Sequence, residues 1–397
     1  MRPYIRRVIA SAAAVATAAA CLFVPAGPAS AAPPADCRLP APPGIFNEHE
    51  GPTDYGRWLN PLGTLKAVVL FVDFSDATPT ASERSERVSL LNPAAGWFTS
   101  SSYNKVSVQL TFDTAWRRMP QPQTAYIGYN TSFTAHQQYL QAAVTAADPA
   151  VNFTQYQLIY VVVPRSASVF TNSPAFIASP GFGVIGDGVE RRHGATFGQD
   201  IDFWGFKVLN HETGHIFGLP DLYSYAGGPN VHAAAGGWDL MGLISGPAPD
   251  YLAWHKWKMA WLNDTQIVCR TSTGISTTTL TPLSTSTGTK AVVVRTGPQR
   301  AVVVENRQVS QLDVASSCFQ PGALVYVVDA SVGGGNNPIR VIDRTPTTAV
   351  PGCDQPHAQL DNATLTTINH EVVDQVSGVR VRLTGSSGTN RTVRVTW

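Results

Sequence analysis

Residues 210–223 read NHETGHIFGLPDLY, and two histidines four positions apart within this stretch constrain the fold more than any other feature. On a helix, His211 and His215 lie one turn apart on the same face. Two neutral imidazoles placed in this way can each bind Zn²⁺ at about 2.0–2.1 Å. Glu212 lies between them, beside the metal, where it can accept a proton from a water that the ion activates. The stretch therefore predicts a helix that carries two zinc ligands and a general base.

The flanking residues predict where this helix begins and ends. Residues 203–209 have the apolar spacing of a buried helix that leads into the motif. Gly218 is expected to end the helix, and Pro220 prevents it from resuming. A chain that turns back at Gly218 can present Asp221 as a third ligand and leave the fourth position open for water and substrate. An open position distinguishes a catalytic zinc site from a structural one.

A second stretch, residues 236–242, reads GGWDLMG. A methionine in a tight turn beneath a zinc site supplies a soft and adaptable floor for the imidazoles. We therefore expect Met241 to lie under the predicted helix.

Together these motifs resemble the metzincin clan of zinc proteases, and within it the secreted immune-inhibitor-A-type peptidases. The likeness covers residues 63–262 well and the C-terminal third only loosely. It rests on the following features: His211, Glu212 and His215 with residues 218–221, residues 238–241, the strand at residues 68–76, and residues 103–108 followed by Trp116 and Pro120.

The resemblance implies a zinc metalloendopeptidase with a metzincin-like α/β catalytic domain, in which Glu212 is the general base for hydrolysis of peptide bonds in extracellular proteins. Many metzincins have a third histidine where this chain has Asp221. Asp239 or a more distant carboxylate therefore stays open as the third ligand. The alternatives are a non-catalytic secreted binding protein on a metalloprotease scaffold, and a zinc hydrolase of small peptides.

The first 31 residues have the pattern of a secretory signal, with a basic start, an Ala-rich apolar run at residues 8–24 and the small residues Ala29, Ser30 and Ala31 before the cleavage point. We therefore expect a secreted, extracellular protein. Three of the 28 basic residues lie in this segment, which leaves 25 against 27 acidic residues. This balance argues against a nucleic-acid partner, and the absence of a second apolar run argues against stable membrane insertion. We expect the protein to be a monomer whose partner is a protein or peptide substrate.

Four cysteines follow the signal segment, and an even number in an oxidising compartment predicts two disulfides. Of three possible connectivities, we favour Cys318 with Cys353 and Cys37 with Cys269. Alternatively, within residues 36–40, the Cys37 thiolate or the Asp36 carboxylate can reach the zinc and hold the enzyme latent. Residues 32–62 are rich in proline and glycine, which predicts an extended arm over the surface or a short pro-segment.

Residues 63–264 are the predicted catalytic domain, in which β and α patterns alternate before the zinc helix. Strands are expected at residues 66–74, 106–112 and 157–163, and helices at residues 82–91 and 134–147. This order indicates an α/β fold with a mixed sheet and the active-site helix under it. Residues 165–197 are expected to include a strand that borders the cleft, where an extended peptide can pair with the sheet edge. Residues 251–262 have the helical spacing of a closing helix whose tryptophans are buried.

Several other residues are weaker candidates for a site. Three lone histidines have no partner at ligand spacing and are expected to be solvated or core residues: His193, His232 and His255. Either Tyr223 or Tyr225 can donate to an oxyanion, or both can pack against Trp238. Asp200 and Asp202 can bind Ca²⁺, although two carboxylates alone are a weak pattern.

Residues 265–397 show short β-type runs separated by turns, which predicts an all-β, sandwich-like C-terminal domain. The expected strands lie at residues 291–295, 301–305, 324–329, 379–383 and 392–397. The glycine-rich run at residues 333–337 is expected to be a link between strands.

Overall fold

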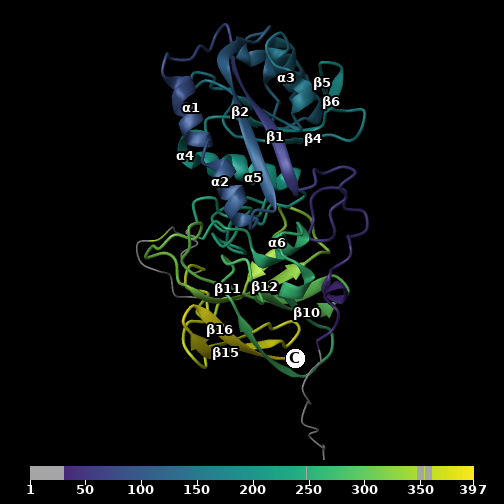
Figure 1. Cartoon of the computed structure of the whole chain (residues 1–397), viewed down its shortest axis with the longest axis vertical. Helices are drawn as coiled ribbons and strands as arrows, with labels where there is room; N and C mark the ends of the chain where they lie inside the picture. Colours follow the sequence, from purple (N-terminus) through teal and green to yellow (C-terminus); the bar gives the residue numbers. More distant parts are fainter. Residues whose placement is uncertain (1–30, 247, 347–352, 354–359) are drawn as a thin grey trace, which may run out of the picture.

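The structure is a computed structural model that describes residues 31–246, 248–346, 353 and 360–397 (Figure 1). The predicted signal segment at residues 1–31 lies almost entirely outside these residues. An α/β layer is followed in the chain by two further β-sheets, so the predicted mixed α/β class with a β-rich C-terminal part is confirmed. In the described part of the chain, no helix is both long and apolar enough to span a membrane.

The first sheet is mixed, with strand order β2-β1-β3-β7-β4. Its members are β1 (Gly63–Asp73), β2 (Val106–Arg118), β3 (Leu158–Val162), β7 (His193–Phe197) and β4 (Ala175–Ile177). Four strands run parallel, and β4 pairs antiparallel with β7 at one edge. Successive side chains of a strand point to opposite faces. In β1, Val69 and Phe71 therefore join one core, while Leu70 and Val72 join another.

Helices cover both faces of this sheet. The face of Leu70 packs against α3 (Phe133–Ala147), and the opposite face packs against α2 (Ala94–Ser101) and α5 (Phe206–Ile216). In Figure 1, α5 lies below the sheet with α1 (Glu83–Leu91) and α4 (Ile201–Trp204) beside it. The Tyr160 hydroxyl of β3 lies 2.7 Å from the Thr213 hydroxyl of α5, a buried contact that ties the helix to the sheet. The predicted placement of the motif helix under the sheet is thus correct.

Two predicted helices differ in the structure. The helical pattern at residues 203–209 is interrupted at Gly205, whose φ of +54° separates α4 from α5. Phe203 is 79 % exposed, so its apolar character does not serve the core. The closing helix α6 is only Ala253–Lys258. Before it, Leu252 is not helical and donates its N–H to the Asp239 carboxylate, and after it Ala260 has a φ of +57°. Burial of its tryptophans is confirmed.

The C-terminal part consists of two sheets that pack face to face. One has the order β13-β12-β11-β10-β8 and the other β14-β15-β16-β9. Their bounds are β8 (Ile267–Arg270), β9 (Ile275–Leu280), β10 (Ala291–Gly297), β11 (Arg300–Arg307), β12 (Gly322–Asp329), β13 (Ile339–Val341), β14 (Glu371–Val373), β15 (Arg380–Ser387) and β16 (Asn390–Thr396). Side chains such as Val292, Val304 and Val393 share one buried cluster between them. A separate hydrophobic core continues from β1 through α5 and α6 to β10–β12, so the sheet that contains these three strands packs directly on the α/β layer.

The N-terminal arm is built into this core. Ala32 N donates to Cys269 O, and Leu59 N donates to Ile216 O at the end of α5. Glu50 is buried and accepts from the indole of Trp254 at 3.0 Å. Figure 1 shows the arm, in purple, running along one side of the molecule from the β10 region to β1. It is therefore more deeply packed than the predicted surface arm, because its polar backbone and Glu50 find partners inside the protein.

Both predicted disulfides are present, Cys37–Cys269 and Cys318–Cys353. The hypothesis that the Cys37 thiolate reaches the metal is therefore wrong, because its sulfur is bonded to Cys269 between the arm and β8. The first disulfide attaches the arm to the C-terminal part covalently.

We expect the double substitution Cys37→Ser and Cys269→Ser to lower the free energy of unfolding by about 2–4 kcal/mol, since it releases a long loop in the unfolded chain. The matched control is Cys318→Ser with Cys353→Ser. Its sequence separation is 35 against 232, so loop entropy predicts a loss smaller by about 1.7 kcal/mol. Urea unfolding of both variants measures the difference, and a larger loss in the control would contradict the argument.

Candidate metal centre

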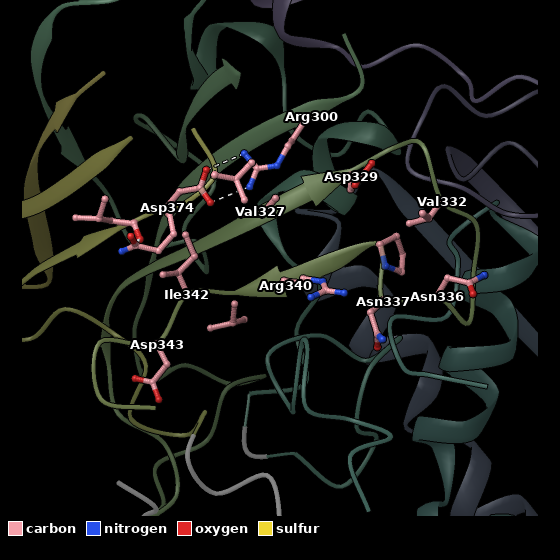
Figure 2. Close-up of a pocket in the computed structure, with 15 residues that line it drawn as sticks. Arg300, Val327, Asp329, Val332, Asn336, Asn337, Arg340, Ile342, Asp343 and Asp374 are labelled. Atoms are coloured by element: carbon pink, nitrogen blue, oxygen red, sulfur yellow. Dashed lines mark hydrogen bonds and ion pairs between the residues drawn. The ribbon is translucent and has the colours of Figure 1, made fainter. Parts of the chain in front are cut away.

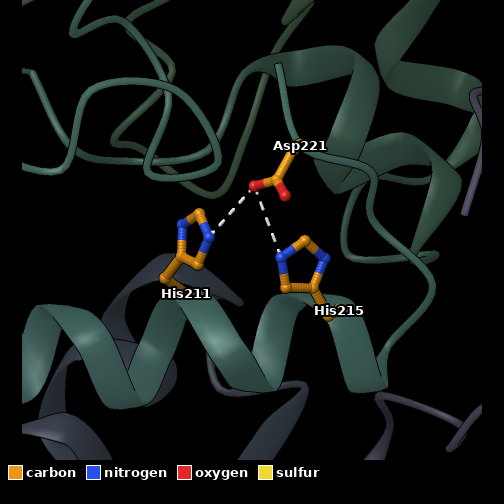
Figure 3. Close-up of side chains that lie close together, drawn as sticks. All are labelled: His211, His215 and Asp221. Carbon is orange, nitrogen blue, oxygen red and sulfur yellow. Dashed lines mark ion pairs between the residues drawn. The ribbon is translucent and has the colours of Figure 1, made fainter. Parts of the chain in front are cut away.

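The structure brings together the three residues predicted as ligands. His211 and His215 lie on one face of α5 with ring centroids 4.9 Å apart. Asp221 lies opposite them, after the chain has turned back (Figure 3). Its Oδ1 atom is 3.1 Å from His211 Nε2 and 3.4 Å from His215 Nε2. Within the described residues, no other His, Cys, Asp or Glu offers a ligand atom to this group.

A hydrogen bond at the Nδ1 atom of each imidazole determines the tautomer of the neutral ring, and with it the state of the Nε2 atom that faces Asp221. His211 Nδ1 lies 2.8 Å from Leu240 O, and His215 Nδ1 lies 2.9 Å from Leu219 O. A carbonyl oxygen only accepts, so each Nδ1 donates and each neutral ring presents the Nε2 lone pair. Asp221 Oδ1 is buried and has no hydrogen-bond donor. Three acceptor atoms therefore converge on one point, which needs either a proton or a cation.

The spacing of these atoms fits a tetrahedral cation such as Zn²⁺. Ligands that each lie 2.0–2.1 Å from such an ion are about 3.3 Å apart, close to the 3.1 and 3.4 Å found between Asp221 and the imidazoles. Without a cation, protons take its place. Burial lowers the pKa of His215, but the charge of Asp221 outweighs it and raises the pKa to about 10. A metal ion would therefore displace protons when it binds.

The chain turn that presents Asp221 requires glycine. Gly218 follows α5 with a φ of +88°, a conformation that favours glycine. Leu219 N then donates to Gly214 O at 2.9 Å, and Leu222 N donates to Met241 O at 2.9 Å. These two bonds hold the segment that carries Asp221 on either side.

Met241 lies beneath α5, as predicted. A Cβ atom added at Gly214 would lie 2.5 Å from Met241 Sδ, so the helix and the turn at residues 238–242 are in direct contact. Leu240 of the same turn provides the carbonyl that orients His211. Asp239, the alternative third ligand, points elsewhere: it accepts from Met241 N at 2.8 Å and from Leu252 N at 2.7 Å. Its role is to stabilise the turn.

Glu212 is buried beside the metal group and lines a cavity of about 290 Å³. His211, Tyr223 and His232 line the same cavity, together with residues 172–173 and 242–245. In the described part of the chain, the Glu212 carboxylate accepts no hydrogen bond from a protein donor. Burial raises the pKa of Glu212 to about 7, although the charges of the two histidines lower it. Glu212 can therefore hold or release a proton near neutral pH.

The two tyrosines after Asp221 have different positions. Tyr225 donates its hydroxyl to Asp221 Oδ2 at 2.6 Å, so it orients the carboxylate. Tyr223 lines the cavity, and its ring is 6.4 Å from that of His211. Burial, and then the charge of Asp221, raise the pKa of Tyr223, which keeps its hydroxyl protonated as a donor. Trp238 packs against Phe319.

The remaining histidine candidates serve the core or the cavity. His193 Nε2 lies 2.8 Å from Arg57 O of the arm. His255 is fully buried, with Asp239 Oδ2 at 2.8 Å on one side and Glu50 Oε1 at 3.1 Å on the other. Burial lowers the pKa of His255, but these two carboxylates outweigh it and raise the pKa to about 10. His255 therefore links the arm to the turn at residues 238–242.

The proposed calcium pair is divided between other partners. Asp200 accepts from the Ser173 backbone N–H at 2.8 Å and from its hydroxyl. Asp202 forms ion pairs with Arg87 at 3.0 Å and Arg165 at 2.9 Å. Guanidinium groups already neutralise Asp202, so the arrangement does not support a calcium site at these two residues.

Sequence reasoning missed the contacts that support Asp221 from the C-terminal part. Gly335 N donates to Asp221 O at 3.1 Å, although residues 333–337 were expected only to link strands. The signal available was the run of three consecutive glycines, which allows a close approach between backbones.

Another cavity, of about 490 Å³, is lined by residues of the C-terminal part and by none of the three candidate ligands (Figure 2). It lies between β12, β13 and the segment that follows β14. Arg300 and Asp374 face each other along its wall and form a two-point ion pair with distances of 2.7 and 2.8 Å. The smaller cavity, by contrast, is lined by His211 and Glu212.

A scan against protein-family models and a search of curated proteins each found no match to this chain. The functional assignment therefore rests on the geometry of the site.

Proposed function

We propose that this protein is a secreted, zinc-dependent endopeptidase that hydrolyses peptide bonds of extracellular proteins, with a metzincin-like catalytic part. The observation that carries the proposal is the convergence of two imidazole Nε2 atoms and one buried carboxylate oxygen beside Glu212. A structural zinc site has four protein ligands. This group has three, and His211 borders an open cavity that Glu212 shares.

The residues around the centre supply the remaining functions. Zn²⁺ bound here would polarise a substrate carbonyl and lower the pKa of a water. Hydrogen bonds to Leu240 O and Leu219 O hold the imidazoles in one tautomer. The Glu212 carboxylate takes a proton from the attacking water and gives it to the leaving nitrogen. The Tyr223 hydroxyl can donate to the negative charge that develops on the carbonyl oxygen.

The edge of the first sheet favours an extended protein substrate over a dipeptide. Strand β4 is the last strand of that sheet, and residues 172–173, just before it, line the cavity beside Glu212. An extended peptide can pair with such an edge through main-chain hydrogen bonds. Secretion is supported by the signal pattern and by the two disulfides, which persist in oxidising compartments.

The test is the metal content of the purified protein together with casein hydrolysis, with and without a chelator. We expect one zinc per chain, loss of hydrolysis on chelation and recovery when zinc is restored. A parallel assay on dipeptides tests whether small peptides are the substrates instead. Zinc without hydrolysis of either would favour the non-catalytic binding protein, and a protein that binds no zinc would overturn the site assignment.

A further inference from the structure

The glycine-rich loop at residues 333–337 connects β12 to β13 and reaches the metal centre from the C-terminal part. Its Gly335 N donates to Asp221 O at 3.1 Å and its Gly335 O accepts from Tyr225 N at 2.9 Å. On its other side, Gly334 N donates to Glu48 O of the arm at 3.1 Å. The loop therefore lies between the arm and the segment that carries Asp221.

The loop approaches this segment so closely that side chains would not fit. A Cβ atom at Gly335 would lie 2.2 Å from the Tyr225 ring, and one at Gly334 would lie 3.2 Å from Asp221 N. Gly335 also has a φ of +76°. The glycines thus fix the position of Tyr225, whose hydroxyl donates to Asp221 Oδ2.

We propose that this loop is a positioning element for Asp221, so that the β-rich C-terminal part completes the metal centre. The loop holds the Asp221 backbone through Gly335 N and its carboxylate through Tyr225, which leaves Oδ1 directed at the two imidazoles. The inference rests on the proposed function in one respect, which is that Asp221 is a ligand of the metal ion. It implies that metal affinity depends on residues more than a hundred positions away from the motif.

The experiment measures zinc affinity of the metal-free full-length protein by competition with a chromophoric chelator, with the thermal midpoint as a second readout. Gly335→Ala should weaken zinc binding by about 10–100-fold, the range for residues that orient ligands. The matched control is Gly378→Ala, because Gly378 has nearly the same φ, +75°, but no atom within 4 Å of an added Cβ. We expect the control to lose stability through backbone strain and to keep its zinc affinity within about twofold of the parent.

A milder variant keeps the inference testable if Gly335→Ala does not fold. Gly334 does not have a positive φ, so Gly334→Ala adds no backbone strain of that kind. Its added Cβ atom would still lie 3.2 Å from Asp221 N, so we expect this variant to weaken zinc binding as well. Unchanged zinc affinity in folded Gly335→Ala, or in Gly334→Ala, would overturn the inference even if hydrolysis were lost. A parent protein that binds zinc without cleaving casein would refute the endopeptidase proposal alone, whereas one that binds no zinc would refute both.

Discussion

Glu212→Gln is expected to lower kcat for peptide hydrolysis by at least about 100-fold while zinc stays bound. The amide has the same size as the carboxylate but cannot take the proton of the attacking water. The metal group does not include Glu212, so His211, His215 and Asp221 should still hold the ion. Steady-state kinetics on a fluorogenic peptide and the zinc content of the same preparation measure the two effects.

The control for this substitution is Glu371→Gln, which makes the same chemical change on β14 of the C-terminal part. It removes part of an exposed interaction with Arg380 and Arg382, and it should leave kcat unchanged. A Glu212→Gln variant that hydrolyses at the parental rate would exclude Glu212 as the general base. Loss of zinc from that variant would show instead that Glu212 contributes to metal binding.

The parts of the structure that the sequence predicts well are those that local pattern determines. The four-residue spacing of His211 and His215 places both on one helix face, and Gly218 ends the helix because its backbone adopts a positive φ. The continuous apolar run of β1 predicts a strand that is buried on both faces, because successive side chains of a strand point to opposite faces and enter two separate cores. The even number of cysteines after the signal segment predicted two disulfides, and the structure contains two.

Other features depend on contacts between residues far apart in sequence. Asp221 was predicted as the third ligand with Asp239 as an alternative, and the structure separates the two because Asp239 is engaged by Leu252 N and His255. The break at Gly205 overrides a helical pattern through one backbone angle. The buried contact of Glu50 with His255 joins residues 205 positions apart, and a local sequence pattern cannot predict such a contact.

The largest stability effect is expected at Arg307, which joins the C-terminal part to the turn that carries Met241. Arg307 is fully buried and contacts Asp313 at 2.8 and 2.9 Å. It also donates to Trp238 O at 2.7 Å and to Ala248 O at 2.9 Å. Arg307→Met should lower the free energy of unfolding by about 3–5 kcal/mol, because it leaves a buried carboxylate without its partner. Urea unfolding measures this loss.

Arg382→Met is the control, since Arg382 is 45 % exposed and pairs with Glu371 on the surface. Such a pair contributes about 0–1 kcal/mol.

If the loss of stability at Arg307 comes from the uncompensated charge, then Arg307→Met combined with Asp313→Leu should recover part of the stability. What the double variant cannot recover is the bond to Trp238 O, so its zinc affinity should stay below that of the parent. A double variant no more stable than Arg307→Met would mean that Arg307 acts mainly through the backbone carbonyls of the turn.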